Sequence, residues 1–343
     1  MPGLLRRSGT RAASDAGRWL VASIGVGALA ACGPARPAAR GDRGTPPPAQ
    51  ASATPGAAEL FAPGVISDAK RQWRITFTAD GQTAYFAESE GFFPATRQAT
   101  IHVTHRVGGT WTEPTVAPFS GRYSDIDPFI TPDGSRLYFS SIRPVDGVLR
   151  GDIDVWYVER TPAGWGEPQR LGPEVNGPAD ELYASASARG DLYFAVGPAG
   201  PGPGADWDIY TAARAGHGFA PRQPIAAVNT DLRFDPRTPT ADWEFNPEIS
   251  TDGRTLVFTS LRPGGHGYGD LYVSHHRGGE WSPPRNLGPA VNTAFDEFHP
   301  TLARDGYLYF ARNTFTPTHG DLYRILATEV QALRPDARGG GRR

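Results

Sequence analysis

The feature that most constrains the fold of this chain is an internal repeat of roughly 53 to 63 residues. Each copy contains a tight turn followed by a short apolar strand, a combination typical of antiparallel β-structure. A period of this length is typical of β-propeller blades rather than of helical solenoids. The five turn-and-strand segments are Ala79–Phe86, Pro132–Phe139, Ala188–Phe194, Thr251–Phe258 and Arg304–Phe310.

Each segment is followed by a second apolar strand and, in four copies, by an aromatic residue close to a proline. The second strands begin at or near Thr100, Asp154, Asp208, Asp270 and Asp321. The last copy lacks the aromatic element, whereas Phe61-Ala-Pro63 stands ahead of the first copy. We therefore expect the N-terminal strand to complete the last blade, because a closed ring leaves only short strand edges unpaired.

The predicted fold is an all-β propeller of about five four-stranded blades over residues 57–327, with the ring closed by the N-terminal strand. The composition agrees, since 42 glycines and 33 prolines suit a chain with many turns. The formal net charge is only −2, and Lys70 is the sole lysine. No basic run indicates a nucleic-acid partner.

The repeats resemble those of the TolB-type propeller family, in which P-x-I-S-P-D-G-x-x-L-Y-F is followed by an S-x-R-P turn. The second and fourth copies carry the resemblance best, with Pro128–Gly134 before Ser141–Pro144 and Pro247–Gly253 before Ser260–Pro263. The resemblance implies a binding role with envelope proteins or peptidoglycan-associated lipoproteins as the partner class.

The N-terminal segment predicts export and a lipid anchor. Four arginines precede an apolar run at Trp19–Ala31 that is too short to span a bilayer, so residues 1–31 are typical of a signal peptide. The run ends in Leu29-Ala-Ala-Cys32, which resembles the lipobox of bacterial lipoproteins. This implies that Cys32 is lipidated and becomes the mature N-terminus. Gly33, in place of an aspartate, favours the outer membrane by the same resemblance.

The ends of the chain differ in composition from the repeats. Residues 32–56 are rich in proline and alanine and predict an extended linker. Residues 328–343 are expected to form a disordered tail. Together these features predict a monomeric protein of the cell envelope that touches the membrane only through its lipid.

Two columns of polar residues recur in all five copies and are the candidate binding site. The first column lies eight positions before the turn and consists of Gln72, Asp125, Glu181, Glu244 and Glu297. The second lies two positions further on and consists of Arg74, Asp127, Tyr183, Asn246 and His299. Because residues i and i+2 share one face of a strand, we expect two polar rings near one mouth of the central channel.

Three alternatives compete with a binding role for these columns. The acids could satisfy backbone N–H groups or pair with arginines for structural reasons alone. They could also form the acid and base of an arabinanase-type glycosidase, which needs two carboxylates about the sugar ring. A calcium ion would require converging acids, and His299 beside Glu297 is the best-placed histidine.

The expected function is therefore a non-catalytic envelope lipoprotein whose propeller binds an envelope protein or a glycan. The alternative is a carbohydrate-active propeller with an acidic central site. No nucleophile elbow, phosphate loop or H-E-x-x-H motif occurs in the sequence, and no cofactor or metal is expected.

Overall fold

The computed structural model describes residues 56–91, 93–199, 206–231, 243–314 and 320–334. The predictions made for the signal peptide, Cys32 and most of the linker lie outside these residues. The described part is almost entirely β-structure, apart from the single turn α1 (Phe93–Thr96) and two short 3-10 turns. None of its helices is long and apolar enough to cross a membrane.

The strands pair into five antiparallel groups, which we call blades one to five. Their first strands are β2 (Arg71–Phe77), β7 (Asp125–Ile130), β12 (Asp180–Ala186), β18 (Glu244–Ile249) and β23 (Asp296–Leu302). Their second strands are β3 (Thr83–Ser89), β8 (Arg136–Ser141), β13 (Leu192–Gly197), β19 (Thr255–Ser260) and β24 (Tyr307–Asn313). Their third strands are β4 (Thr100–Val107), β9 (Asp154–Thr161), β14 (Asp208–Ala212), β20 (Asp270–Arg277) and β25 (Gly320–Leu326).

The outermost strands are short. They are β6 (Thr115–Val116), β11 (Gln169–Arg170), β17 (Gln223–Pro224), β22 (Arg285–Asn286) and β1 (Glu59–Leu60). The third strands of blades one, two and four also run on into small hairpins with β5 (Thr110–Trp111), β10 (Gly164–Trp165) and β21 (Glu280–Trp281). In blade three, β15 (Arg214–Ala215) pairs with β16 (Gly218–Phe219) in the same place.

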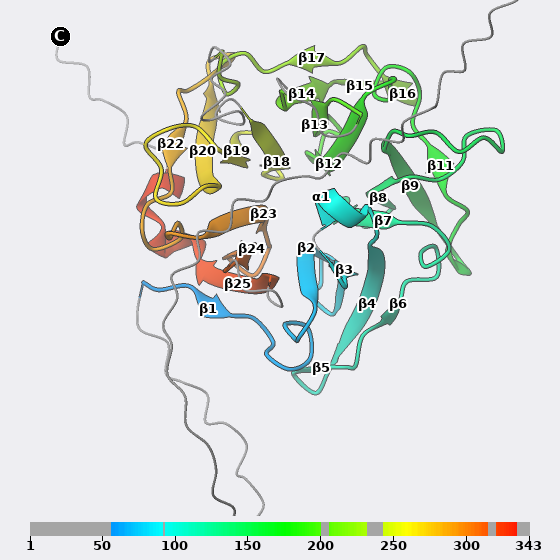
Figure 1. Ribbon diagram of the computed structural model, residues 1–343, viewed down its shortest axis with the longest axis horizontal. Helices are drawn as coiled ribbons and strands as arrows, with labels where there is room; N and C mark the ends of the chain where they lie inside the picture. The colour runs from blue at the N-terminus through cyan, green and yellow to red at the C-terminus, as the bar shows by residue number, and fades with distance from the viewer. Residues whose placement is uncertain (1–55, 92, 200–205, 232–242, 315–319, 335–343) are drawn as a thin grey trace, which may run out of the picture. The chain divides into compact units, whose positions relative to one another are not determined.

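The blades are arranged around a common centre as in a β-propeller (Figure 1). The first strand of each blade contacts the first strand of the next, and β23 of blade five contacts β2 of blade one. Side-chain bonds reinforce these contacts, because the Thr301 hydroxyl donates to the Ile75 carbonyl at 2.6 Å and the Ile130 N–H donates to the Thr76 hydroxyl at 3.1 Å. Most blades are thus joined only by packing and side-chain bonds. Blades five and one are also joined into one sheet, because Arg71 of β2 pairs in parallel with Gly320 of β25.

The outer strand of blade five comes from the N-terminal side of the propeller. β1 pairs antiparallel with β25, so that Glu59 lies opposite Arg324 and Leu60 opposite Tyr323. The next residue, Phe61, donates its N–H to the Leu322 carbonyl at 2.8 Å and is buried edge-on against Tyr309, with ring centroids 4.9 Å apart. This pairing joins the two ends of the repeat region in one sheet.

Apolar side chains of the second and third strands fill the spaces between the blades. The phenylalanine that ends each repeated turn-and-strand segment is fully buried; these residues are Phe86, Phe139, Phe194, Phe258 and Phe310.

The asparagines of the repeated Val-Asn pairs hold the third strands in place. Asn176 accepts from the Val155 N–H and donates to the Val155 carbonyl, and Asn292 bonds Leu271 in the same way. The amide thus binds the third strand as a neighbouring backbone would.

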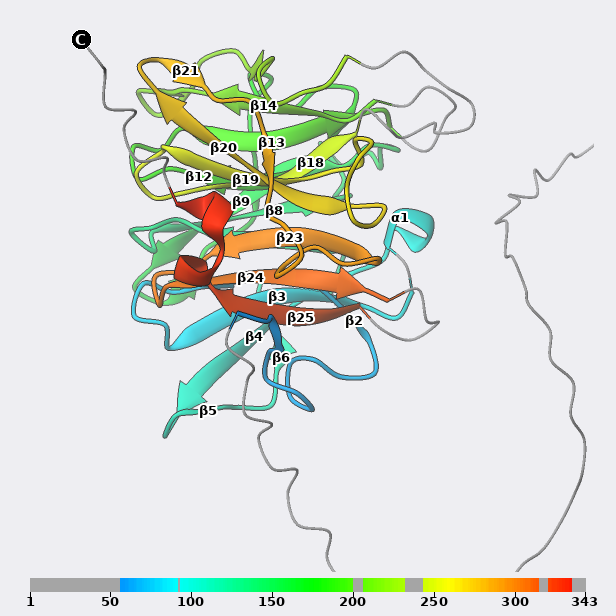
Figure 2. The ribbon, with the colours of Figure 1, turned by 90° about the vertical axis from the view of Figure 1, so that its left-hand side faces the viewer.

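The segment after β25 differs from the disordered tail expected from residue 328. It forms two 3-10 turns, η1 (Ala327–Glu329) and η2 (Gln331–Leu333), at the end of the strands opposite α1 (Figure 2). Val330 between them is buried in an apolar cluster with Val273 and Leu308. Burial of this side chain explains why the order extends beyond the last strand.

The contact of Phe61 with the last blade predicts a large effect on stability. Phe61→Ala should lower the free energy of unfolding by about 3 kcal/mol, because the truncation leaves a cavity beside Tyr309. Leu60→Ala is the matched control, since Leu60 is 39% exposed and should cost less than about 1 kcal/mol. Urea denaturation of both variants measures the difference. Equal losses would show that β1 does not hold blade five in solution.

Candidate functional site

The acids of the first column are buried in ion pairs with arginines. Asp125, Glu181, Glu244 and Glu297 each have no exposed surface. The pairs are Arg143 Nη2–Asp125 Oδ2 at 2.9 Å, Arg222 Nη1–Glu181 Oε1 at 2.6 Å, Arg262 Nη2–Glu244 Oε1 at 3.1 Å and Arg312 Nε–Glu297 Oε1 at 2.7 Å. Gln72 takes the place of the acid in blade one and donates to Asp68.

Each of these four pairs also binds the loop that leads into its blade, and we call the unit a clamp. The guanidinium donates to a loop carbonyl, as Arg262 does to Val228 at 2.7 Å and Arg312 to Val291 at 2.9 Å. In three of them the carboxylate accepts a loop N–H, as Glu244 does from Thr230 at 2.8 Å. Burial raises the pKa of all four acids, and the arginines oppose that shift. In this geometry the first-column acids hold the loops in place. Because they are fully buried, they are not exposed at a mouth of the central channel.

The second column does not share a face with the first. The pairing of each first strand with its neighbour shifts register at this column, so a β-bulge interrupts the alternation expected from the sequence. Four of the five residues have left-handed backbone; φ is 59° at Asp127, 65° at Tyr183, 53° at Asn246 and 52° at His299. Such backbone costs roughly 1 kcal/mol or more at a residue other than glycine, and a bulge redirects the side chain.

These four redirected side chains meet at the centre. His299 Nδ1 lies 3.1 Å from Asp127 Oδ1 and 3.2 Å from Asn246 Nδ2, and its ring lies 5.5 Å from that of Tyr183. Apart from the histidine contact, neither carboxylate oxygen of Asp127 has a hydrogen-bond partner among the described residues. Burial, together with the Asp127 charge, raises the pKa of the Tyr183 phenol well above its ordinary value. Blades two to five each contribute one residue.

Arg74, the member from blade one, has a different environment. Its guanidinium donates to the carbonyls of Tyr183 at 3.2 Å and Ala184 at 2.8 Å, and it forms a buried ion pair with Glu248. Glu248 also accepts the Leu302 N–H at 3.1 Å. The pair therefore ties blades one, three, four and five together across the centre. A buried charge is tolerated when it is paired and hydrogen-bonded in this way.

Aromatic rings surround the central polar cluster at the end of the strands where α1 lies. Trp73 is 5.5 Å from His299, Phe245 is 6.0 Å from Tyr183, and Trp207 is 6.2 Å from Tyr183. Trp243 and Phe298 extend the network. Trp73, Phe245 and Phe298 each stand between the two polar columns in the sequence, but no repeated pattern indicates that Trp207 would join them. Trp207 stands just ahead of β14, outside the repeated columns.

Exposed apolar side chains occur at the same end. The strands of each blade are antiparallel, so loops from second to third strands and segments entering first strands all emerge beside α1 (Figure 2). Val148 and Leu149 lie on such a loop in blade two, Tyr268 on one in blade four, and Phe295 ahead of β23. Their exposed fractions are 62%, 69%, 74% and 38%. We call these four residues, with Trp207 and Trp243, the aromatic face.

The chemistry available at the centre is limited. Glycoside hydrolysis requires two carboxyl groups on either side of the sugar. Here Glu248 is held by Arg74, the first-column acids are held by their arginines, and Asp127 is buried beside His299. No group of three or more histidine, cysteine or acidic residues in the described ranges is arranged to hold a metal ion.

Comparisons with known proteins indicate the fold. No family model and no curated protein matches the sequence. Among solved structures, a thermostable family-43 glycoside hydrolase is 10% identical with a TM-score of 0.52, covering 77% of this chain and 91% of that one. TolB from Acinetobacter baumannii is 14% identical with a TM-score of 0.47, covering 76% of this chain and 53% of that one. This chain thus spans about half the length of that TolB.

A putative TolB from Agrobacterium tumefaciens is 16% identical with a TM-score of 0.43, covering 71% of this chain and 70% of that one. At these identities the likeness concerns the fold alone. The pairing of the strands and the family-43 likeness define the class of protein, an all-β propeller.

The clamps predict that the first column contributes to stability. Glu244→Ala leaves Arg262 without its buried carboxylate and should lower the free energy of unfolding by roughly 3 kcal/mol. Glu280→Ala, at an exposed hairpin, is the control and should change it by less than about 0.5 kcal/mol. Chemical denaturation measures both. Unchanged stability of Glu244→Ala, with loss of binding, would instead make this acid part of a ligand site.

Proposed function

We propose that this chain is a non-catalytic lipoprotein of the bacterial envelope, whose propeller binds a partner protein through the aromatic face. The supporting observation is the concentration of exposed apolar side chains on loops of different blades at one end of the propeller. Exposed apolar side chains gathered on one surface of a monomer are typical of interaction sites. Aromatic residues are also enriched in the cores of protein interfaces.

The centre supports binding over catalysis. The described carboxylates of the two columns are engaged by arginines or, for Asp127, by His299. A general acid needs access to substrate, whereas Asp127 has no exposed surface. The buried cluster instead supports the aromatic rings from below. A rigid set of rings reduces the entropy lost when a partner docks.

Glycan binding is the second candidate, because Trp207 and Trp243 are half-buried with ring centroids 6.4 Å apart, and tryptophan rings are common stacking partners of sugars. The likeness to a family-43 glycoside hydrolase shows a shared fold only. It does not assign the reaction of that enzyme to this chain. The same experiment distinguishes the two candidates.

The aromatic face predicts a specific effect of two exposed substitutions. The full-length protein with Leu149→Glu and Tyr268→Ser should bind its partner at least roughly tenfold more weakly, because a charge replaces apolar surface in the interface. Val107→Glu is the matched control, since Val107 is 66% exposed at the opposite end. Partners are crosslinked in detergent-solubilised envelopes and identified, and each is then titrated as a purified protein against the three forms.

A protein whose titrated affinity falls only with the double variant supports the proposal. Equal affinities of all three forms for every captured protein would exclude the aromatic face as the docking site. Retention of saccharide alone, lost with Trp243→Ala, would favour the glycan-binding candidate. Release of shortened saccharide would identify an enzyme.

The proposed anchor rests on Cys32 and the apolar run before it. Cys32→Ser should move the protein from the membrane fraction to the soluble fraction, because the thiol that would carry the lipid is removed. Metabolic labelling with a radioactive fatty acid checks the modification itself, and the unsubstituted protein is the control. A Cys32→Ser protein that stays in the membrane fraction would contradict the anchor.

A further inference from the structure

A large pocket lies at the end of the strands opposite the aromatic face. It has a volume of about 670 Å³, within the range of roughly 300 to 1,000 Å³ typical of small-molecule sites. Its wall comes from the turns and strand ends of blades two and three, with contributions from Thr251 of blade four and Arg304 of blade five. No residue of either polar column lines the pocket.

The wall of the pocket is positively charged. Five arginines line it, against the two carboxylates Asp133 and Glu159; the arginines are Arg136, Arg160, Arg189, Arg214 and Arg304. Of these five arginines, only Arg136 has a carboxylate partner within the described part of the chain, and that partner is Glu159. Asp133 accepts from Thr131 and Ser135 within its own turn. The positive charge of the wall is therefore only partly neutralised by the protein.

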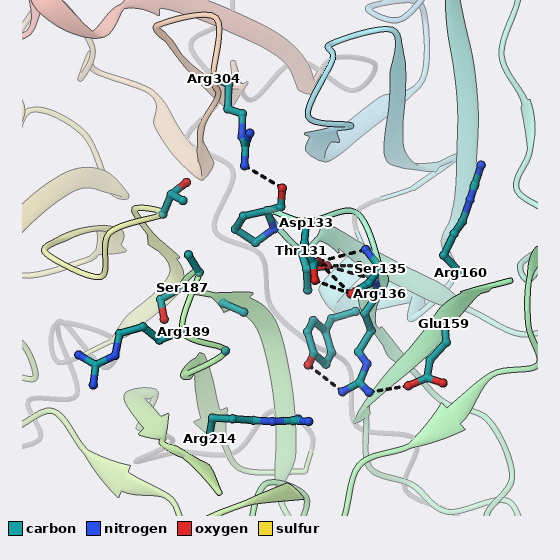
Figure 3. A pocket seen from close by; sticks show the side chains of 16 residues that line it. Thr131, Asp133, Ser135, Arg136, Glu159, Arg160, Ser187, Arg189, Arg214 and Arg304 are labelled. Carbon is teal, nitrogen blue, oxygen red and sulfur yellow. Dashed lines mark hydrogen bonds and ion pairs between the residues drawn. The ribbon is translucent and has the colours of Figure 1, made fainter. Parts of the chain in front are cut away.

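Several of these guanidinium groups are held in position. Arg136 lies over the Tyr157 ring at 4.3 Å, and its Nη1 lies 3.4 Å from the Tyr138 hydroxyl. Arg214 lies over the Phe219 ring at 5.6 Å, close enough to Tyr138 to lower the pKa of the phenol, although burial raises that pKa overall. Figure 3 shows Arg304 approaching from the side opposite Arg136 and Arg214. Its Nη2 donates to the Pro132 carbonyl at 2.7 Å.

Ser187 also lines the pocket and is 3% exposed. Its Oγ is buried and has no hydrogen-bond partner within the described part of the chain. The equivalent hydroxyls of Thr131 and Ser250 donate to the aspartate two residues further on, whereas blade three has Arg189 at that position. The replaced aspartate therefore explains the unpaired hydroxyl, and the arginines alone carry the binding chemistry of the pocket.

We propose that this pocket binds a small phosphate-bearing molecule, with Arg136 of blade two and Arg214 of blade three binding the phosphate. Arginine matches phosphate oxygens through paired N–H groups. A phosphate has more charge and more acceptor oxygens than a carboxylate, so it suits a wall with several guanidinium groups. Arg304 and Arg189 add to the positive field at the entrance.

The test is calorimetric titration of the full-length protein with inorganic pyrophosphate as the probe. We expect saturable binding that weakens as ionic strength rises, because charge attraction is screened. Arg214→Gln should weaken binding by at least roughly fivefold. Arg254→Gln is the matched control, because Arg254 is an exposed arginine of the blade-four turn that lies outside the pocket wall, and it should bind as the unsubstituted protein does.

Thermal unfolding of each variant shows whether it folds. Arg214→Gln removes a charge that has no carboxylate partner among the described residues, so it should keep the melting temperature and still lose affinity. Absence of pyrophosphate binding, or equal affinities of the Arg214→Gln and Arg254→Gln variants, would overturn the proposal. Binding to phosphatidylglycerol vesicles but not to pyrophosphate would also overturn it, because the positive surface would then attract a membrane. The substitutions leave the aromatic face intact, so the two proposals can fail separately.

Discussion

The structure depends on the clamp formed by a buried carboxylate, an arginine and the loop between two blades. Apart from the single parallel pairing of β2 with β25, the blades share no sheet, so their relative position must come from packing and from side-chain bonds. In four blades the acid at or beside the start of the first strand accepts from an arginine that also donates to the preceding loop. Arginine suits this task because its planar group binds two acceptors at once. The clamp fixes where each first strand begins.

The position of the first strands decides what reaches the centre. Two residues after each clamped position a β-bulge redirects one side chain, and three of these four side chains gather around the fourth, His299. The fifth, Arg74, crosses to Glu248 and fills the space below. Polar groups thus occupy the centre in pairs, and the surrounding aromatic rings are held on a rigid base. Strained backbone at four equivalent positions is the cost of that arrangement.

The two ends of the propeller differ in chemistry because they are built from different loops. The tight turns between first and second strands are short and polar, and they carry arginines into the pocket of blades two and three. The loops between second and third strands are longer and carry exposed apolar residues such as Leu149 and Tyr268. An apolar end suits a protein surface, whereas a charged pocket suits a small anion. One fold can therefore present two unrelated binding chemistries.

The sequence by itself determined the repeat, the positions of the long strands and the all-β propeller class, because turn residues and apolar alternation are local signals. It also predicted the recurrence of the acids, but the partner of Glu181 is Arg222, which lies outside the repeated S-x-R-P turn. Only the tertiary structure decided that a bulge separates Asp125 from Asp127, that Trp207 joins the central rings, and that arginines of different blades line one pocket. These depend on contacts between residues far apart in the chain, which no local pattern encodes.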